Sequence, residues 1–141
     1  MQDNRVRDAL GYTLARAFRM ANRATAKRLK QYDVSAEQAH ILFVLWSGPS
    51  MRVGELQRVL ALSSATIAGA LDRMEQVGLV RRVDDEKDGR ASRVEPAPMV
   101  ARRRRGIEEE LIAVEREAFA ALTAKERTEL LRLLKKVAPD D

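Results

Sequence analysis

The feature that most constrains the fold is a pair of short amphipathic helices joined by a tight turn. "GELQRVL" predicts a helix from about Gly54 to Leu60, and Ser63 is suited to cap the next helix because its hydroxyl can accept a backbone hydrogen bond. Gly78 is suited to end that second helix. The positions expected to face inward are Leu56, Val59 and Leu60 in the first helix and Ile67, Ala70, Leu71, Met74 and Val77 in the second. This spacing predicts a helix-turn-helix.

A β-hairpin is predicted immediately after the pair. "LVRRV" (79–83) and "SRVE" (92–95) are strand-like, and the segment between them, "DDEKDGRA" (84–91), is polar with one glycine, as a turn is. Prolines close the second strand, and a short strand at "MRV" (51–53) can join the hairpin. The chain is therefore predicted to be mainly α with a small β-hairpin wing.

Helical segments flank this unit on both sides. The capping boxes "SAEQ" (35–38) and "TAKE" (123–126) predict helix starts, and "AHILFVLW" (39–46) predicts a buried helix. The terminal helices carry apolar stripes at Leu10, Leu14, Phe18, Ala21, Thr25 and Leu29, and at Ile107, Leu111, Val114, Ala118 and Leu122. The winged unit is too small to cover both stripes. Residues 6–32 and 99–137 are therefore expected to pack against the same regions of a second chain, the alternative being four-helix packing within one chain.

Composition places the chain among folded proteins. Its 141 residues, 45% hydrophobic and 33% charged, suit one domain spanning 1–141. A net charge of +5 favours a polyanionic partner, although GC-rich codons also produce the preference for arginine over lysine. The absence of cysteine from the sequence excludes disulfides and thiolate chemistry. Because neither a signal peptide nor an apolar run of about 20 residues is visible, a cytoplasmic protein with no membrane partner is expected.

Residues 54–94 resemble the DNA-binding region of MarR-family transcriptional regulators. "LS..TI....DRME..GLV" is similar to the family's recognition helix and its exit into the wing, and "DGR...V" is similar to its wing. The resemblance is good over about 35–97, while the terminal helices agree in order and length only. It implies a winged helix-turn-helix flanked by N- and C-terminal dimerisation helices. It also implies a recognition helix at about 64–77 in the major groove and a wing at 84–91 in the minor groove.

The chain departs from the family pattern at several positions. Gln57 stands where a small residue is usual, Ala61 where glycine is frequent, and Ala68 and Gly69 near positions that often carry Thr or Arg. A proline–alanine pair follows the wing where Leu-Thr is common, which removes a helix N-cap usually worth about 0.5–2 kcal/mol. These departures concern how bases are read and leave the core pattern intact.

The face of the second helix opposite its apolar stripe is the candidate DNA-reading surface. Ala65 and Ala68 can touch thymine methyl groups, Ser64 and Thr66 can reach phosphates or bases, and Arg73 is the strongest long donor. Specificity is therefore expected to rest more on groove shape and phosphate register than on direct readout. The predicted DNA-binding residues are Ser64, Ala65, Thr66, Ala68, Gly69, Arg73, Asp88, Arg90 and Arg93. The alternative is that Ala and Gly are helix filler and that Asp72 pairs with Arg73 at the surface.

Two further basic features have open interpretations. Arg90, at the tip of the wing, can enter the minor groove with Asp88 holding its side chain extended, or the loop is simply a solvated acidic turn. "RRRR" (102–105) spreads its charges around a helix, so a solvated face is expected, with two arginines paired to glutamates four residues on. Contact of this run with the DNA backbone or with a second chain is the alternative.

The resemblance also implies a ligand pocket, because members of the family often bind small phenolic or other lipophilic molecules beside the dimerisation helices. The candidate lining residues are Tyr12, Arg16, Arg19, His40 and Phe43, although Phe43 suits a packed core better. His40 is the only histidine, and a satisfied core or pocket role is expected for it. No nucleophile–base pair, metal-ligand spacing or phosphate-binding loop is visible, so no enzyme, metal site or cofactor is expected.

The sequence as a whole predicts a homodimeric, sequence-specific DNA-binding transcriptional regulator. It is expected to be a repressor relieved by a small ligand and to bind a pseudo-palindromic operator in double-stranded DNA. The alternative is a winged-helix dimer that serves as a protein-interaction module with weak or no specific DNA binding. The sparse side chains of the second helix and the acidic wing favour that alternative.

Overall fold

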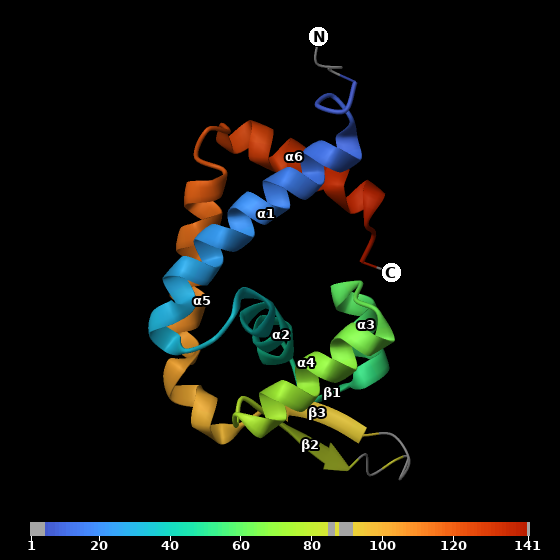
Figure 1. Cartoon of the computed structure of the whole chain (residues 1–141), viewed down its shortest axis with the longest axis vertical. Helices are drawn as coiled ribbons and strands as arrows, with labels where there is room; N and C mark the ends of the chain where they lie inside the picture. Colours follow the sequence, from blue (N-terminus) through green and yellow to red (C-terminus); the bar gives the residue numbers. More distant parts are fainter. Residues whose placement is uncertain (1–4, 85–86, 88–91, 141) are drawn as a thin grey trace.

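The helices and strands follow the predicted order. The computed structural model describes residues 5–84, 87 and 92–140. Within these residues no helix is both long enough and apolar enough to cross a bilayer. The elements, with η for a 3₁₀ helix, are α1 (Leu10–Leu29), η1 (Lys30–Tyr32), α2 (Ala36–Trp46), β1 (Met51–Arg52), α3 (Val53–Leu60), α4 (Ser64–Gln76), β2 (Val80–Asp84), β3 (Ser92–Pro96), η2 (Pro98–Val100), α5 (Ala101–Ala118) and α6 (Ala124–Val137) (Figure 1).

Local signals set both ends of α4. The Ser63 hydroxyl accepts a hydrogen bond from the backbone N–H of Thr66 at 3.2 Å. At the other end Gly78 has φ +77°, a backbone conformation that favours glycine, and the N–H of Leu79 then donates to the carbonyl of Met74 at 2.8 Å. The predicted cap and stop are confirmed. Together they let the chain leave the helix and turn directly into β2.

The sheet is small and antiparallel, with strand order β1-β3-β2. The central strand β3 places Val94 opposite Met51 on one side and Arg82 on the other. Val94 is fully buried, so this strand anchors the wing to the core. The short third strand expected at residues 51–53 is present as β1, and it ends where α3 begins.

The core forms around α2, which both α1 and the sheet contact. The capping box at its start is confirmed, because Ser35 and Gln38 exchange hydrogen bonds at 2.9 and 3.1 Å. Each large apolar side chain removed from water contributes about 1.5–3 kcal/mol. The largest fully buried side chains are Leu29, Ile41, Leu42, Leu45, Leu56, Ile67, Leu71, Met74, Leu79, Val94, Val100 and Ile107.

Helices α1 and α5 pack side by side along much of their length (Figure 1). Arg28 of α1 donates to Glu110 of α5 at 2.8 Å and also pairs with Glu117, and these carboxylates hold the pKa of Arg28 above its usual value. A Cβ added at Gly106 would lie 2.3 Å from the Tyr32 hydroxyl oxygen, so glycine is what lets that ring lie against α5. Helices α1 and α5 are thereby joined within one chain.

Several apolar side chains that were expected to face inward are exposed. Val59, Val77 and Phe43 have exposed fractions of 51%, 59% and 50%, so the expectation of burial is wrong for all three, a packed-core role for Phe43 included. Each lies at the edge of an apolar stripe, and the core covers only the middle of that stripe. The stripe of α1 is covered at its C-terminal end, where Leu29 is buried, and not at its start, where Leu10 is 88% exposed.

Candidate nucleic-acid interface

Helix α4 turns one face to the core and the other to solvent. Ile67, Leu71 and Met74 are almost fully buried, while the opposite residues are exposed or, at Gly69, half-buried. The helix lies against β2, beside the hairpin (Figure 1). The structure therefore brings six of the predicted DNA-binding residues onto one surface: Ser64, Ala65, Thr66, Ala68, Gly69 and Arg73.

The long side chain of Arg73 lies back across this surface. A Cβ added at Gly69 would be only 3.2 Å from Nη1 of Arg73, so the guanidinium rests over the glycine. Glycine thus gives the long side chain room to lie along the helix. The arginine presents its donors over the middle of the exposed face, where the neighbouring side chains are small.

Two acidic residues of α4 pair with one arginine of the wing. Arg82 of β2 donates to Asp72 at 2.8 Å and lies 3.7 Å from a carboxylate oxygen of Glu75. The suggested Asp72–Arg73 pair is therefore replaced by a pair between two elements. Exposed pairs stabilise a fold by only about 0–1 kcal/mol, so the consequence is mainly electrostatic: two carboxylates beside the reading face are offset by one cation. Sequence reasoning missed this pair, although the alternation of side chains along β2 was the available signal.

Hydroxyl groups at the start of α4 are linked to one another and to α3. The Ser63 hydroxyl donates to that of Thr66 at 2.8 Å. The Ser64 hydroxyl donates to the amide oxygen of Gln57 at 3.3 Å. Gln57 was not among the predicted site residues, although its departure from the family pattern was a signal. The structure places it at the edge of the same surface.

The described arginines of the hairpin mostly hold the sheet together. Arg93, a predicted DNA-binding residue, is half-buried and donates through Nε to the Ser50 hydroxyl at 2.9 Å and through Nη2 to the Ser50 carbonyl. Arg81 pairs across the strands with Glu95. The predicted wing residues Asp88 and Arg90 lie outside the described residues, so their roles stay predictions.

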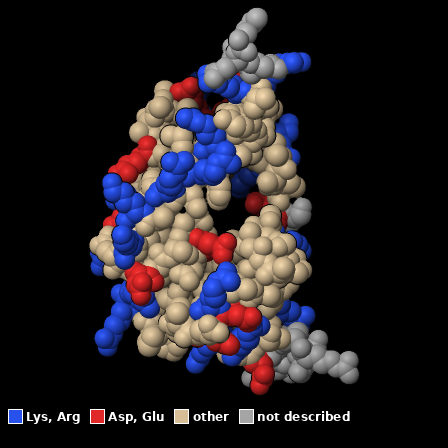
Figure 2. Space-filling view, viewed as in Figure 1, with Lys and Arg blue, Asp and Glu red and all other residues tan. Residues whose placement is uncertain are grey.

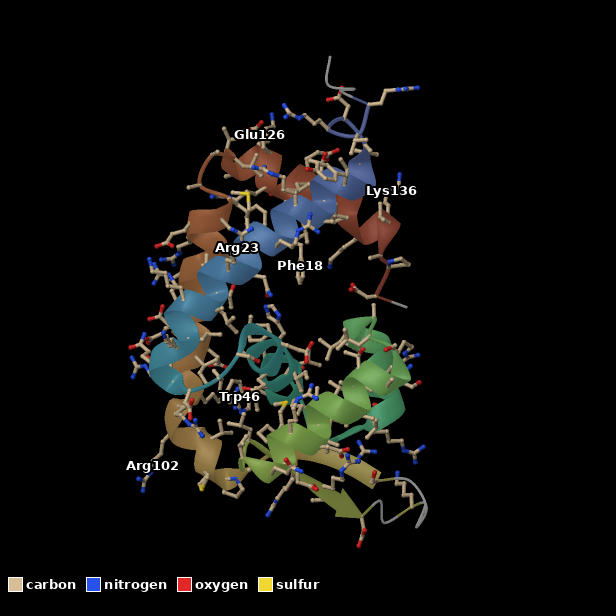
Figure 3. All side chains as sticks on the ribbon, in the orientation of Figure 1. Phe18, Arg23, Trp46, Arg102, Glu126 and Lys136 are labelled. Atoms are coloured by element: carbon tan, nitrogen blue, oxygen red, sulfur yellow. The ribbon has the colours of Figure 1, made fainter. Side chains whose placement is uncertain are left out.

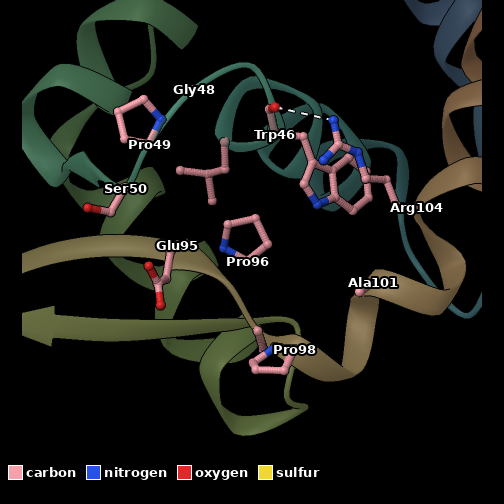
Figure 4. A pocket seen from close by; sticks show the side chains of 11 residues that line it. Trp46, Gly48, Pro49, Ser50, Glu95, Pro96, Pro98, Ala101 and Arg104 are labelled. Carbon is pink, nitrogen blue, oxygen red and sulfur yellow. Dashed lines mark hydrogen bonds between the residues drawn. The ribbon is translucent and has the colours of Figure 1, made fainter.

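The arginine run at the start of α5 is not a uniformly solvated face. Arg103 donates to the carbonyl of Tyr32 at 2.9 Å. Arg104 donates to the carbonyl of Trp46 at 3.3 Å, and its guanidinium carbon is 5.4 Å from the centroid of the Trp46 ring (Figure 4). The expectation of simple solvation is wrong for these two, because their acceptors come from distant segments. The predicted pairs are confirmed, Arg104 with Glu108 and Arg105 with Glu109, each at 3.0 Å.

A hollow of about 390 Å³ lies between the turn after α2, the end of β3 and the start of α5 (Figure 4). Trp46 and Arg104 form one wall, and Pro49 and Pro96 contribute to the rest. Its charged residues are already paired, Arg104 with Glu108 and Glu95 with Arg81. The predicted ligand-pocket residues do not line this hollow.

The five predicted ligand-pocket residues lie on two helices. Tyr12, Arg16 and Arg19 are exposed on α1, Phe43 is exposed on α2, and His40 of α2 is half-buried. Burial lowers the pKa of His40. Figure 2 shows a hollow between α1 and the winged part of the chain, and Phe18 points from α1 toward it (Figure 3). Among the residues that the structure describes, no three carboxylate or imidazole side chains cluster as metal ligands would.

Positive charge is spread beyond the winged part. Figure 2 shows a band of Lys and Arg along α1, a helix that carries Arg16, Arg19, Arg23 and Lys27. The net charge of +5 is thus not concentrated at α4 alone. The geometry of α4 therefore identifies the candidate interface better than the total charge does.

An exposed second helix, a tight turn before it and an antiparallel hairpin after it define a winged helix-turn-helix protein. The family model "MarR family" matches residues 34–92. The chain is 33% identical over 86 residues to the HTH-type transcriptional regulator MgrA of Staphylococcus aureus, a match that covers 60% of this chain and 58% of MgrA. The chain therefore spans less than two thirds of that relative.

Two solved structures have the same fold over nearly the whole chain. One is a probable transcriptional regulator from Pseudomonas aeruginosa, 26% identical, with a TM-score of 0.85 over 94% of this chain and 99% of that one. The other is a mutant of E. coli MarR complexed with operator DNA, 24% identical, with a TM-score of 0.87 over 99% of this chain and 100% of that one. The predicted fold class is confirmed. MgrA is described as a transcriptional regulator, and the Pseudomonas aeruginosa protein as a probable one.

Proposed function

We propose that this protein is a homodimeric transcriptional regulator that binds DNA sequence-specifically, with α4 in the major groove and the wing against the minor groove. The observation that carries the proposal is the exposed face of α4. Its side chains are small, Arg73 lies over Gly69, and Arg82 offsets the nearby carboxylates. A surface of this kind admits the close approach of base edges and does not repel phosphates.

The fold supports the same placement. E. coli MarR, in the structure that holds operator DNA, has the same arrangement of helices and wing. On this basis Ser64, Thr66 and Arg73 contact phosphates or bases, and Ala65 and Ala68 contact thymine methyl groups. Arg90, braced by Asp88, enters the minor groove. Direct readout by α4 is sparse, so groove shape contributes much of the specificity.

A second copy of the chain is the occupant we propose for the exposed apolar surfaces of the terminal helices. Phe18 on α1 is 59% exposed, and Leu131 and Val137 on α6 are 56% and 75% exposed. Single exposed apolar residues are ordinary, but a run of them along two neighbouring helices marks an interaction surface. A two-fold dimer places two α4 helices about 34–36 Å apart, one turn of DNA, which suits a pseudo-palindromic operator.

We further propose that the protein represses transcription and releases DNA when a small lipophilic or phenolic ligand binds. The proposed ligand residues, Tyr12, Arg16, Arg19, His40 and Phe43, lie on the two helices beside the hollow between α1 and the winged part. A molecule bound there would contact both α1 and the winged part. It would therefore favour one separation of the two α4 helices over another.

The test is fluorescence anisotropy of the full-length protein on the intergenic DNA beside its own gene. A scrambled duplex of the same length is the control, and both are measured at about 50 and 200 mM salt. Specific binding is expected to be at least about 10³-fold tighter than binding to the scrambled duplex. Adding phenolic carboxylates to the bound complex then tests ligand relief.

Each outcome separates the proposal from its alternative. Tight, salt-sensitive binding that prefers the native duplex supports a specific regulator. Equal binding to both duplexes leaves only the electrostatic attraction and contradicts sequence specificity. Failure to bind at low salt contradicts DNA binding altogether and favours a protein-interaction module.

A further inference from the structure

Gln57 lies where α3 meets the start of α4, at the elbow of the helix-turn-helix. Its side chain is half-buried, and its amide oxygen accepts a hydrogen bond from the exposed Ser64 hydroxyl at 3.3 Å. The turn brings the two together, because the N–H of Leu62 also donates to the backbone carbonyl of Gln57 at 3.1 Å. The amide is thereby oriented by the first residue of the reading helix.

This bond gives the acceptor oxygen and the donor NH₂ group of the glutamine amide different roles. The oxygen, which is the acceptor, is used within the protein, and the NH₂ group keeps two protons to donate. Ala65 and Ala68, the next exposed positions, carry only methyl groups and so cannot compete for a base at this end of α4. Gln57 is therefore the long donor at the N-terminal end of the surface, as Arg73 is over its middle.

We propose that Gln57 reads a guanine in each operator half-site, an inference that rests on the DNA-binding function proposed above. A glutamine with both amide atoms free pairs with adenine, donating to N7 and accepting from the N6 amino group. The bond to Ser64 takes one of the two lone pairs of the amide oxygen and holds that oxygen toward the protein, so the NH₂ group is the part of Gln57 best placed to face a base. Guanine presents two adjacent acceptors, N7 and O6, and is the base edge that best matches an amide that offers its donors.

The two long donors are also spaced to read neighbouring bases. The guanidinium of Arg73 lies over Gly69, five residues along the helix from Ser64. At 1.5 Å per residue this separation is about 7.5 Å. Base pairs are stacked about 3.4 Å apart, so the two donors can reach different base pairs of one half-site.

The experiment is selection of bound duplexes from a library randomised across the half-site, using the full-length protein. Wild type, Gln57→Ala, Ser64→Ala and Gln57→Glu are compared, with Gln76→Ala, an exposed glutamine at the far end of α4, as the matched control. Wild type and control should select G·C at one position per half-site. Gln57→Ala should lose that preference alone, with affinity for the selected site falling roughly tenfold.

The other two variants test the orientation of the amide. Ser64→Ala frees the amide oxygen, so adenine should become acceptable at the same position. Gln57→Glu keeps the size of the side chain and cannot donate from its carboxylate, so the preference should move toward cytosine. This variant also keeps the test decisive if Gln57→Ala folds poorly, which thermal melting reports.

Two results would overturn the inference while leaving the proposed function intact. One is a uniform loss of affinity in Gln57→Ala across all sequences with a shallower salt dependence, which indicates a phosphate contact. The other is an unchanged preference in both Gln57 variants. A wild-type protein that selects no sequence would instead contradict the proposed function itself.

Discussion

Apolar side chains lie in opposite environments in the winged part of the molecule, about residues 35–97, and in its terminal helices. In the winged part Leu42, Leu56 and Ile67 are at most 1% exposed. In the terminal helices Leu10, Phe18 and Val137 are 88%, 59% and 75% exposed. Both regions have apolar positions at helical spacing, so the difference lies in what surrounds the stripes.

The contrast indicates which region folds within one chain and which needs another. The core around α2 is completed within one chain, and Leu29 of α1 and Ile107 of α5 belong to it. Helix α6 contacts few other described elements of the same chain. Helix α1 packs against α5 and α2, but its start is exposed, and its ion pair with Glu110 is partly exposed and contributes little. The stability of the winged part should thus be independent of protein concentration. The order of the terminal helices should depend on protein concentration.

The largest expected effect comes from placing a charge on the exposed stripe of α1. Phe18→Asp should leave the winged fold intact and abolish dimerisation, because the carboxylate would be buried without a partner in the interface. Loss of simultaneous contact with two half-sites should lower operator affinity by about 10²–10⁴-fold. Sedimentation equilibrium and anisotropy measure the two effects.

Val59→Asp is the matched control, since Val59 is 51% exposed on α3 in the winged part. It should leave the dimer mass unchanged. A Phe18→Asp protein that sediments as a dimer at micromolar concentration would show that α1 is not the interface.

The next prediction compares the truncation of a leucine in the winged part with the truncation of a leucine in a terminal helix. Leu42→Ala removes a fully buried side chain and should lower the free energy of unfolding by about 2–5 kcal/mol at any protein concentration. Leu131→Ala, at a position 56% exposed in one chain, should show a loss that grows with protein concentration across the range where the dimer forms. Urea unfolding at several concentrations distinguishes them. An equal loss at both sites, independent of protein concentration, would contradict the proposed difference between the winged part and the terminal helices.

Much of the winged part could be predicted from the sequence because its signals are local. Ser35 with Gln38, and Ser63 with Thr66, bond within one helical turn, and Gly78 acts at its own backbone. The errors concern side chains whose surroundings come from elsewhere in the chain. Phe43 lies in an apolar segment and is nevertheless half exposed, because periodicity does not say which elements cover a face.

The candidate site was predictable in outline and not in detail. The exposed face of α4 follows from its apolar stripe, so Ser64 and Arg73 could be placed on it. The contacts that orient the site join separate elements: Arg82 reaches Asp72, and Ser64 reaches Gln57. Arg103 and Arg104 likewise find backbone acceptors in η1 and α2. A sequence motif gives no information about such pairs.

A smaller effect is expected where the two terminal segments meet, between η1 and α5. Gly106→Ala places a Cβ against the hydroxyl end of the Tyr32 ring, so the ring must move away from α5. The expected loss of stability is about 1–3 kcal/mol. Adding Tyr32→Ala should recover part of it, since the ring that clashes is gone, and a double-mutant cycle measures the coupling.

Gly54→Ala is the control for that cycle, because a Cβ there meets nothing within 4 Å. In an open helical position alanine should stabilise by up to about 1 kcal/mol. Additive losses at Gly106 and Tyr32 would show that their contact does not hold η1 against α5.

The smallest effect tests backbone strain at the turn of the helix-turn-helix. Ala61 has φ +53°, in the left-handed region where a Cβ is unfavourable. Ala61→Gly should therefore raise the free energy of unfolding by roughly 0.5–1 kcal/mol, measured by urea denaturation. Asp33, at the junction between the terminal helices and the winged part, has φ 55°, but aspartate tolerates this conformation, so Asp33→Gly should gain less. A larger gain at Asp33 than at Ala61 would place the more strained turn at the junction, outside the helix-turn-helix.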